Sequence, residues 1–117
     1  MSKRSSRLYV QDIRESIDAI FQYVLGLTFT DFCADRMRYS AVIREFEIIG
    51  EAVVKLSPHL TKQFPDVQWQ DIKDFRNLLI HEYFGVDLEI VWKVIRDDLP
   101  KLYETILKIE EVLDAEI

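Results

Sequence analysis

Apolar residues recur along the chain at intervals of three to five positions, the spacing that gathers them on one face of an α-helix. In residues 4–27 this face comprises Leu8, Ile13, Ile17, Ile20, Val24 and Leu27. In residues 31–56 it comprises Tyr39, Ile43, Phe46, Ile49 and Val53. Both segments are therefore predicted to form amphipathic helices, the first ended near Gly26 and the second preceded by Thr30 as its N-cap.

Helix signals continue in the second half of the chain. Ser57 and Pro58 are typical of a helix start, with serine at the N-cap and proline in the first turn, and they predict a short helix that stops before Pro65. Residues 66–84 form the next predicted helix, which Gly85 ends. Its inward positions are Trp69, Ile72, Phe75 and Leu79.

The last predicted helix follows Asp87, its expected cap, and carries apolar residues at helical spacing as far as Leu113. Pro100 lacks a backbone donor, so it should kink this helix or restart it, with Asp98 as the cap. The short connections place consecutive helices antiparallel. Residues 1–117 are thus predicted to form a single all-α domain, an antiparallel four-helix up-and-down bundle with an extra short helix and a kinked last helix.

One glycine lies inside a predicted helix. Gly50 occurs in the stretch EIIGEA, within the helix expected over residues 31–56. Glycine in a helix interior costs about 1 kcal/mol relative to alanine. We therefore expect Gly50 to permit close approach of a neighbouring helix backbone.

Composition narrows the class of protein. Gly and Pro number only three each among 117 residues, too few for a turn-rich β-sandwich. No apolar run approaches ~18 residues, and the basic start MSKRSSRLYVQD is not followed by the apolar segment of a secretory signal. A single cysteine, Cys33, excludes an internal disulfide and fits a reducing cytoplasm. The net charge of −6 argues against broad electrostatic binding of nucleic acid but leaves room for a small basic site.

The stretch RNLLIHEY places polar side chains around an apolar run. On a helix, Asn77 and His81 are four residues apart and share a face, which also includes Asp74. Arg76 and Tyr83 are seven residues apart and lie along a neighbouring stripe of the helix. Arg76 and His81 are separated by about 140° around the helix axis. One helix end therefore offers a fixed cation, a titratable base, an amide and a phenol.

This inventory suits metal-free cleavage of RNA. Histidine can take the proton of a 2′-hydroxyl or protonate the leaving oxygen. The guanidinium of Arg76 can bind phosphoryl oxygens as negative charge gathers on them, and Asn77 could orient either group. The spacing alone also fits a helix end without catalytic function. In that case His81 would have ordinary hydrogen-bond partners, and Arg76 would form an ion pair with one of the many acidic residues. No second histidine completes a zinc helix and no glycine-rich phosphate loop is present, so no metal or cofactor is expected.

The stretch RNLLIHEY resembles the Arg-x4-His-x-Tyr motif of HepT toxins, within the HEPN superfamily. The resemblance extends over collinear blocks: EIIGEAVVKLSP at residues 47–58, VQWQDIKDFRNLLIHEYFGVD at 67–87, VW at 91–92 and DLPKL at 98–102. The region of resemblance extends over about residues 39–102, and the motif shows no departure from the family pattern.

The resemblance implies a homodimeric helical bundle in which Arg76 and His81 of both protomers face one cleft, and Asn77 is a position where the family carries a polar residue. Helical spacing adds Asp74, on the face of Asn77 and His81, as a second supporting residue. It implies a cytoplasmic, metal-independent endoribonuclease that acts as the toxin of a toxin–antitoxin pair on an RNA substrate. It also implies an antitoxin, the nucleotidyltransferase MntA, which transfers AMP from ATP to the motif tyrosine, here Tyr83. An adenylate there would place an anion and a bulky base beside Arg76.

Two other functions fit the same residues. The chain could be a non-catalytic helical module that holds a minimal nucleotidyltransferase. It could also be a nucleotide-binding accessory domain, which direct binding of ATP by the isolated chain would support.

Overall fold

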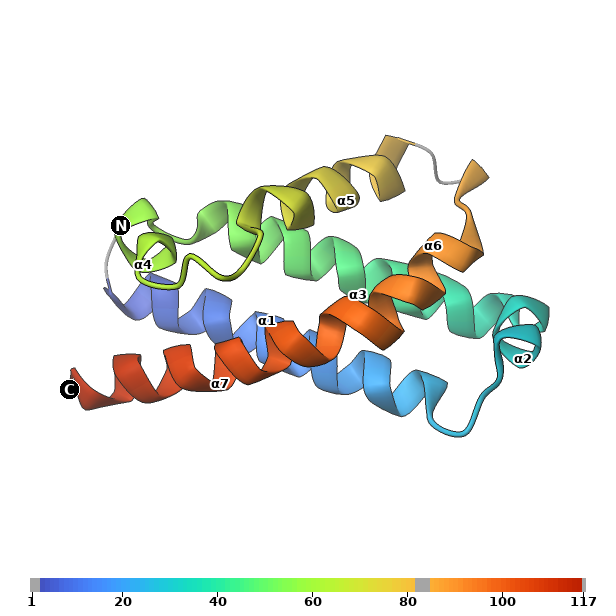
Figure 1. Ribbon diagram of the computed structural model, residues 1–117, viewed down its shortest axis with the longest axis horizontal. Coiled ribbons are helices and arrows are strands. Elements are labelled where there is room, and N and C mark those ends of the chain that lie inside the picture. The colour runs from blue at the N-terminus through green and yellow to red at the C-terminus, as the bar shows by residue number, and fades with distance from the viewer. Residues whose placement is uncertain (1–2, 82–84, 117) are drawn as a thin grey trace.

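The computed structural model describes residues 3–81 and 85–116, and it is built from helices that run back and forth along one long axis (Figure 1). In chain order these are α1 (Lys3–Val24), α2 (Phe29–Ala34), α3 (Arg36–Lys55), α4 (Pro58–Lys62), α5 (Trp69–His81), α6 (Leu88–Lys93), the π-helical turn η2 (Val94–Asp98) and α7 (Leu99–Ala115). No strand occurs in the described ranges. The predicted all-α, up-and-down architecture is confirmed.

Helix α3 is the centre of the fold, because it packs against α1 on one side and against α5 on the other. Helix α7 packs against α1, which completes the order α5, α3, α1, α7. The inward faces of α1, α3 and α7 supply most of the buried core, with fully buried residues such as Ile17, Val42 and Ile106. An apolar groove of about 520 Å³ separates α5 from η2 and α7, and Phe46, Phe75 and Leu102 are among its lining residues.

The predicted helix over residues 31–56 is two helices, and Thr30 is not its cap. Thr28 begins α2 instead: its hydroxyl accepts from the Asp31 N–H, and its own N–H donates to the Asp31 carboxylate, both at 3.1 Å. Asp35 then leaves the helical conformation, with φ −114° and ψ 89°. Its carboxylate accepts from the Arg38 N–H at 3.1 Å and starts α3. In a continuous helix the Arg38 N–H would donate to a backbone carbonyl, but here it donates to the Asp35 side chain. This N-cap explains why α2 and α3 are separate helices.

Two other predicted caps are confirmed. The Ser57 hydroxyl accepts from the Leu60 N–H at 3.2 Å at the start of α4, and the Asp87 carboxylate accepts from the Glu89 N–H at 2.9 Å at the start of α6. The predicted cap at Asp98 is wrong, because its side chain makes no capping bond. The chain instead passes through the η2 turn directly into α7, with Pro100 in the first turn. Pro100 has no backbone N–H to donate. The widening of the helix to a π-helical turn therefore sacrifices no backbone hydrogen bond from that residue.

Within the described residues, no helix combines the length and the apolar character needed to cross a membrane.

Candidate active site

Helix α5 has a buried apolar side and an exposed polar side. Leu79 is fully buried in the core, and Phe75 packs edge-on against Phe46 of α3 with ring centroids 5.2 Å apart. Asp74, Asn77 and His81 are exposed on the opposite stripe. The apolar contacts of α5 with α3 therefore fix the helix so that these three polar side chains face outward.

Arg76 lies between the two sides, against Gly50 of α3. A Cβ atom added to Gly50 would lie 2.5 Å from Cγ of Arg76 and closer still to its Cβ. Such distances are shorter than van der Waals contact, so only glycine allows the two helices to meet here. The predicted close helix approach at Gly50 is confirmed, but the nearest atoms belong to the Arg76 side chain and not to a helix backbone.

The guanidinium of Arg76 has only a neutral partner in the described part of the chain. Its Nη1 donates to Oδ1 of the adjacent Asn77 at 3.0 Å. Its Nε is buried and finds no acceptor there, and no carboxylate of the described residues forms an ion pair with it. Four other arginines do pair with acids: Arg7, Arg14, Arg38 and Arg44. Arg76 is thus held in place without its charge being neutralised by these residues.

The remaining predicted residues are less closely joined. The Asp74 carboxylate accepts from Nε2 of Gln70 at 3.0 Å and makes no hydrogen bond to Asn77 among the described contacts. His81 ends α5 and is exposed, and within the described residues no hydrogen bond joins it to Arg76. Tyr83 lies outside the described residues. A single chain therefore brings Arg76 and Asn77 together but leaves His81 apart from them.

Metal ligands do not gather in the described ranges, where no group of three His, Cys, Asp or Glu side chains could hold an ion. A further feature, which helical periodicity did not predict, is an open pocket between α2 and α6 that includes Phe29, Trp92 and Arg96. The only sequence signal for it was the VW pair at residues 91–92, one of the blocks of resemblance. Helical periodicity does not distinguish an aromatic in such a pocket from one in the core.

Comparison with known proteins gives concordant matches over most of the chain. The family model "Ribonuclease HepT-like" matches residues 13–109. A protein of Thermococcus cleftensis named "Probable ribonuclease HepT" is 39% identical over 100 residues, which cover 86% of this chain and 91% of the relative. A "Putative RNase" of Methanocaldococcus jannaschii is 37% identical over 102 residues, covering 87% and 94%.

A longer protein of Methanocaldococcus jannaschii, named "Gamma-glutamylcyclotransferase and putative RNase", is 40% identical over 112 residues. These cover 96% of this chain but 50% of the relative, so the chain spans about half the length of that protein. No solved structure matches the chain significantly.

Proposed function

Because the chain belongs to the family of HepT-like ribonucleases, we propose that it is an endoribonuclease, the toxin of a toxin–antitoxin pair, and that Arg76 and His81 carry its chemistry. The observation that supports this most directly is the guanidinium of Arg76, which is positioned by Gly50 and bonded to the neutral amide of Asn77. A cation left without a carboxylate partner in the described contacts is available to a phosphate. The proposed substrate is RNA and the proposed location is the cytoplasm.

The reaction follows from these groups without a metal ion. The imidazole of one His81 takes the proton of the 2′-hydroxyl, and the oxygen attacks the adjacent phosphorus. The bond from phosphorus to the 5′-oxygen breaks, and a second, protonated imidazole gives its proton to that oxygen. The products are a 2′,3′-cyclic phosphate and a 5′-hydroxyl. Arg76 stabilises the negative charge on the non-bridging oxygens, and Asn77 orients the guanidinium.

Two imidazoles and a shared phosphate call for two copies of the chain. We place the dimer contact on the outer stripe of α5, where Leu78 lies between Asp74 and His81 along the helix and is 43% exposed. A twofold contact there would bring the two His81 side chains towards each other and bury Leu78 against its counterpart. Arg76 lies about 160° around α5 from Leu78, so each guanidinium would border the same cleft only at its edge, through the extended side chain.

The oligomeric state tests this contact. Light scattering should give about twice the chain mass of 13.9 kDa. Leu78→Glu should yield monomers without RNA cleavage, because it places like charges opposite each other. Leu107→Glu is the matched control, since Leu107 is 40% exposed on α7 and should leave the dimer intact. A stable monomer that still cleaves RNA would exclude the shared cleft.

Catalysis is tested by substitution on folded protein. Arg76→Ala should lower kcat/KM for RNA by ~10²–10³-fold, as expected for loss of one donor to transition-state charge. His81→Ala should lower it by ~10²–10⁴-fold, the usual contribution of general acid–base catalysis. Arg36→Ala removes an exposed arginine of α3 and serves as the control. Cleavage should persist in a chelator of divalent cations.

Full activity of either variant would refute the assignment. If the wild-type chain cleaves no RNA but binds a nucleotidyltransferase partner, the alternative of a non-catalytic binding module is the correct one.

Silencing is proposed to occur at Tyr83, two residues after His81. An MntA-type nucleotidyltransferase would direct the tyrosine oxygen to the α-phosphorus of ATP, with pyrophosphate as the leaving group. The resulting phosphodiester anion, seven residues from Arg76, would neutralise the charge of the Arg76 guanidinium. The adenine of the attached AMP would fill the cleft. RNA cleavage should therefore stop while the fold is retained.

Mass spectrometry after incubation with the antitoxin and ATP-Mg tests this step. Tyr83→Phe should remain unmodified and active in the presence of the antitoxin. Tyr103→Phe is the control. The Tyr103 hydroxyl donates a hydrogen bond to Asp18, which raises the pKa of the phenol and disfavours its attack on ATP. An adenylate that maps to Tyr103, or that still forms on Tyr83→Phe, would exclude Tyr83 as the acceptor.

A further inference from the structure

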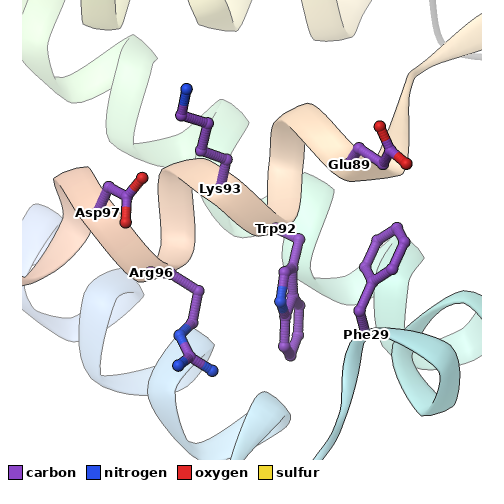
Figure 2. Close-up of a pocket in the computed structure, with 6 residues that line it drawn as sticks. All are labelled: Phe29, Glu89, Trp92, Lys93, Arg96 and Asp97. Atoms are coloured by element: carbon purple, nitrogen blue, oxygen red, sulfur yellow. The ribbon is translucent and has the colours of Figure 1, made fainter.

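An open pocket of about 530 Å³ lies where α6 and η2 meet the start of α2 (Figure 2). Its lining residues are Phe29, Glu89, Trp92, Lys93, Arg96 and Asp97. Its volume is in the range of sites that hold small molecules. None of these six residues belongs to the site on α5.

Trp92 is a fixed, partly accessible aromatic surface in this pocket. Its ring packs against the fully buried Phe32 with centroids 5.1 Å apart and against Phe29 with centroids 6.0 Å apart. Val91, its neighbour in the sequence, is buried in the core, whereas Trp92 is only half-buried. The contact with Phe32 orients the indole without covering it.

A cation stands beside the same ring. Cζ of Arg96 lies 6.0 Å from the Trp92 centroid, and Figure 2 shows Arg96 and Phe29 on opposite sides of the indole. The Arg96 side chain is exposed, so the guanidinium can move outward by a rotamer change. A flat ring could then lie between the indole and the guanidinium plane. Proteins bind unpaired nucleobases between such aromatic and guanidinium surfaces.

The charges around the pocket favour one phosphate rather than a long polyanion. Lys93 and Arg96 are balanced by Glu89 and Asp97, so the rim has no net charge. In Figure 2 the exposed Lys93 side chain points away from the indole, so it can contact a single phosphate next to a stacked base only after a rotamer change. The two carboxylates oppose a denser array of phosphates. Stacking would therefore supply most of the affinity, with little preference among bases.

The position of the pocket connects it with the candidate active site. Helix α5 ends with His81, and α6 begins seven residues later. Figure 1 shows the last turn of α5, α6 and α2 at the same end of the molecule. A single strand that leaves the cleft at His81 can thus extend along this end of the bundle.

We propose that the pocket is a subsite for RNA, in which one nucleobase outside the cleaved step stacks between the indole of Trp92 and the guanidinium of Arg96. Lys93 contacts the phosphate of that nucleotide. The subsite rests on the proposed ribonuclease function and extends it, because it gives the enzyme a preference for single strands long enough to reach from the cleft to α6.

Binding is tested apart from cleavage with an all-deoxy single strand of about eight nucleotides, which lacks the attacking 2′-hydroxyl. The chain has two tryptophans, so a Trp69→Phe background leaves Trp92 as the fluorophore. The strand should quench its fluorescence. Arg96→Ala should weaken binding by between about 5- and about 150-fold, the range expected for a full loss of base stacking. Phe29→Leu removes only the aromatic neighbour on the other side of the indole, so it should weaken binding less. Lys108→Ala removes an exposed cation of α7 and should bind as the parent does.

Salt dependence and cleavage complete the test. Lys93→Ala should reduce the slope of log affinity against log salt by about 1, as expected for one phosphate contact. On an oligoribonucleotide, Arg96→Ala should raise KM more than it lowers kcat. Unquenched Trp92 fluorescence, or binding by folded Arg96→Ala and Phe29→Leu equal to that of the parent, would overturn the subsite. Quenching with the expected losses, but without cleavage of RNA by the wild type, would support the pocket as a nucleotide site and reject the ribonuclease function.

Discussion

Replacing Gly50 by alanine changes the stability of the bundle through two terms of opposite sign. In an exposed helix interior the substitution would stabilise the protein by about 1 kcal/mol, because alanine has the higher helix propensity. At Gly50 the new Cβ would lie 2.5 Å from Cγ of Arg76 and closer to its Cβ. The Cβ of Arg76 is fixed to the α5 backbone and cannot rotate away, so the helices must separate.

Overpacking of this kind costs about 1–3 kcal/mol. After subtraction of the propensity gain, Gly50→Ala should lose up to about 2 kcal/mol of stability. For a chain of this size each kcal/mol corresponds to roughly 3–6 °C in Tm. Gly50→Leu should lose more, because the additional atoms extend further into the space of Arg76.

Thermal and urea unfolding in three backgrounds can separate the two terms. Arg76→Ala keeps a Cβ at the contact, so Gly50→Ala should remain destabilising there. Arg76→Gly removes that atom, and Gly50→Ala should then become neutral or stabilising. The difference between the backgrounds is the coupling free energy of the two positions. A higher Tm for Gly50→Ala in the wild-type background, or an equal effect in all three, would refute the close contact.

Three further predictions concern the caps and loops. Ser57→Ala should cost about 1 kcal/mol, because its hydroxyl caps α4, whereas Ser57→Asn should be nearly neutral in thermal unfolding. Trp69→Phe should cost about 1 kcal/mol in urea unfolding, because the indole N–H donates to the carbonyls of Phe64 and Thr61 at 3.1 and 3.2 Å. The backbone and side-chain hydrogen bonds from Arg38 lower the pKa of Asp35, so its contribution is present above the unfolded pKa and is lost as pH falls through the folded one. The Tm difference between Asp35→Ala and wild type should therefore shrink below about pH 4, and a constant difference would contradict this reasoning.

Much of the fold follows from local sequence. The helical faces and the caps at Ser57 and Asp87 depend on residues within a few positions of each other, and the single glycine inside a helix was enough to predict a close approach at Gly50. The break between α2 and α3 was missed because both sides have helical periodicity, and a single residue, Asp35, separates them. The turn before Pro100 was missed because proline excludes a regular backbone bond without specifying which irregular geometry replaces it.

The candidate site was predictable in its residue types but not in its contacts. Asn77 follows Arg76 in the sequence, and helical spacing placed His81 on a different stripe of the helix from Arg76. It did not indicate that the Arg76 stem would cross Gly50, because that contact depends on the packing of α5 against α3. The pocket at Trp92 likewise requires α2 and α6 to meet, and no pattern within either segment specifies this.

The first turn of α1 and the last turn of α7 lie together at one end of a molecule whose longest dimension is 45 Å, whereas α5 ends with His81 towards the opposite end (Figure 1). Attachments at either terminus would therefore stand clear of the candidate active site. A linked domain, an affinity handle or a surface anchor could be added there without obstructing an incoming strand. For handling the protein in the laboratory, this arrangement makes both termini suitable for immobilisation, because the candidate active site then lies at the free end.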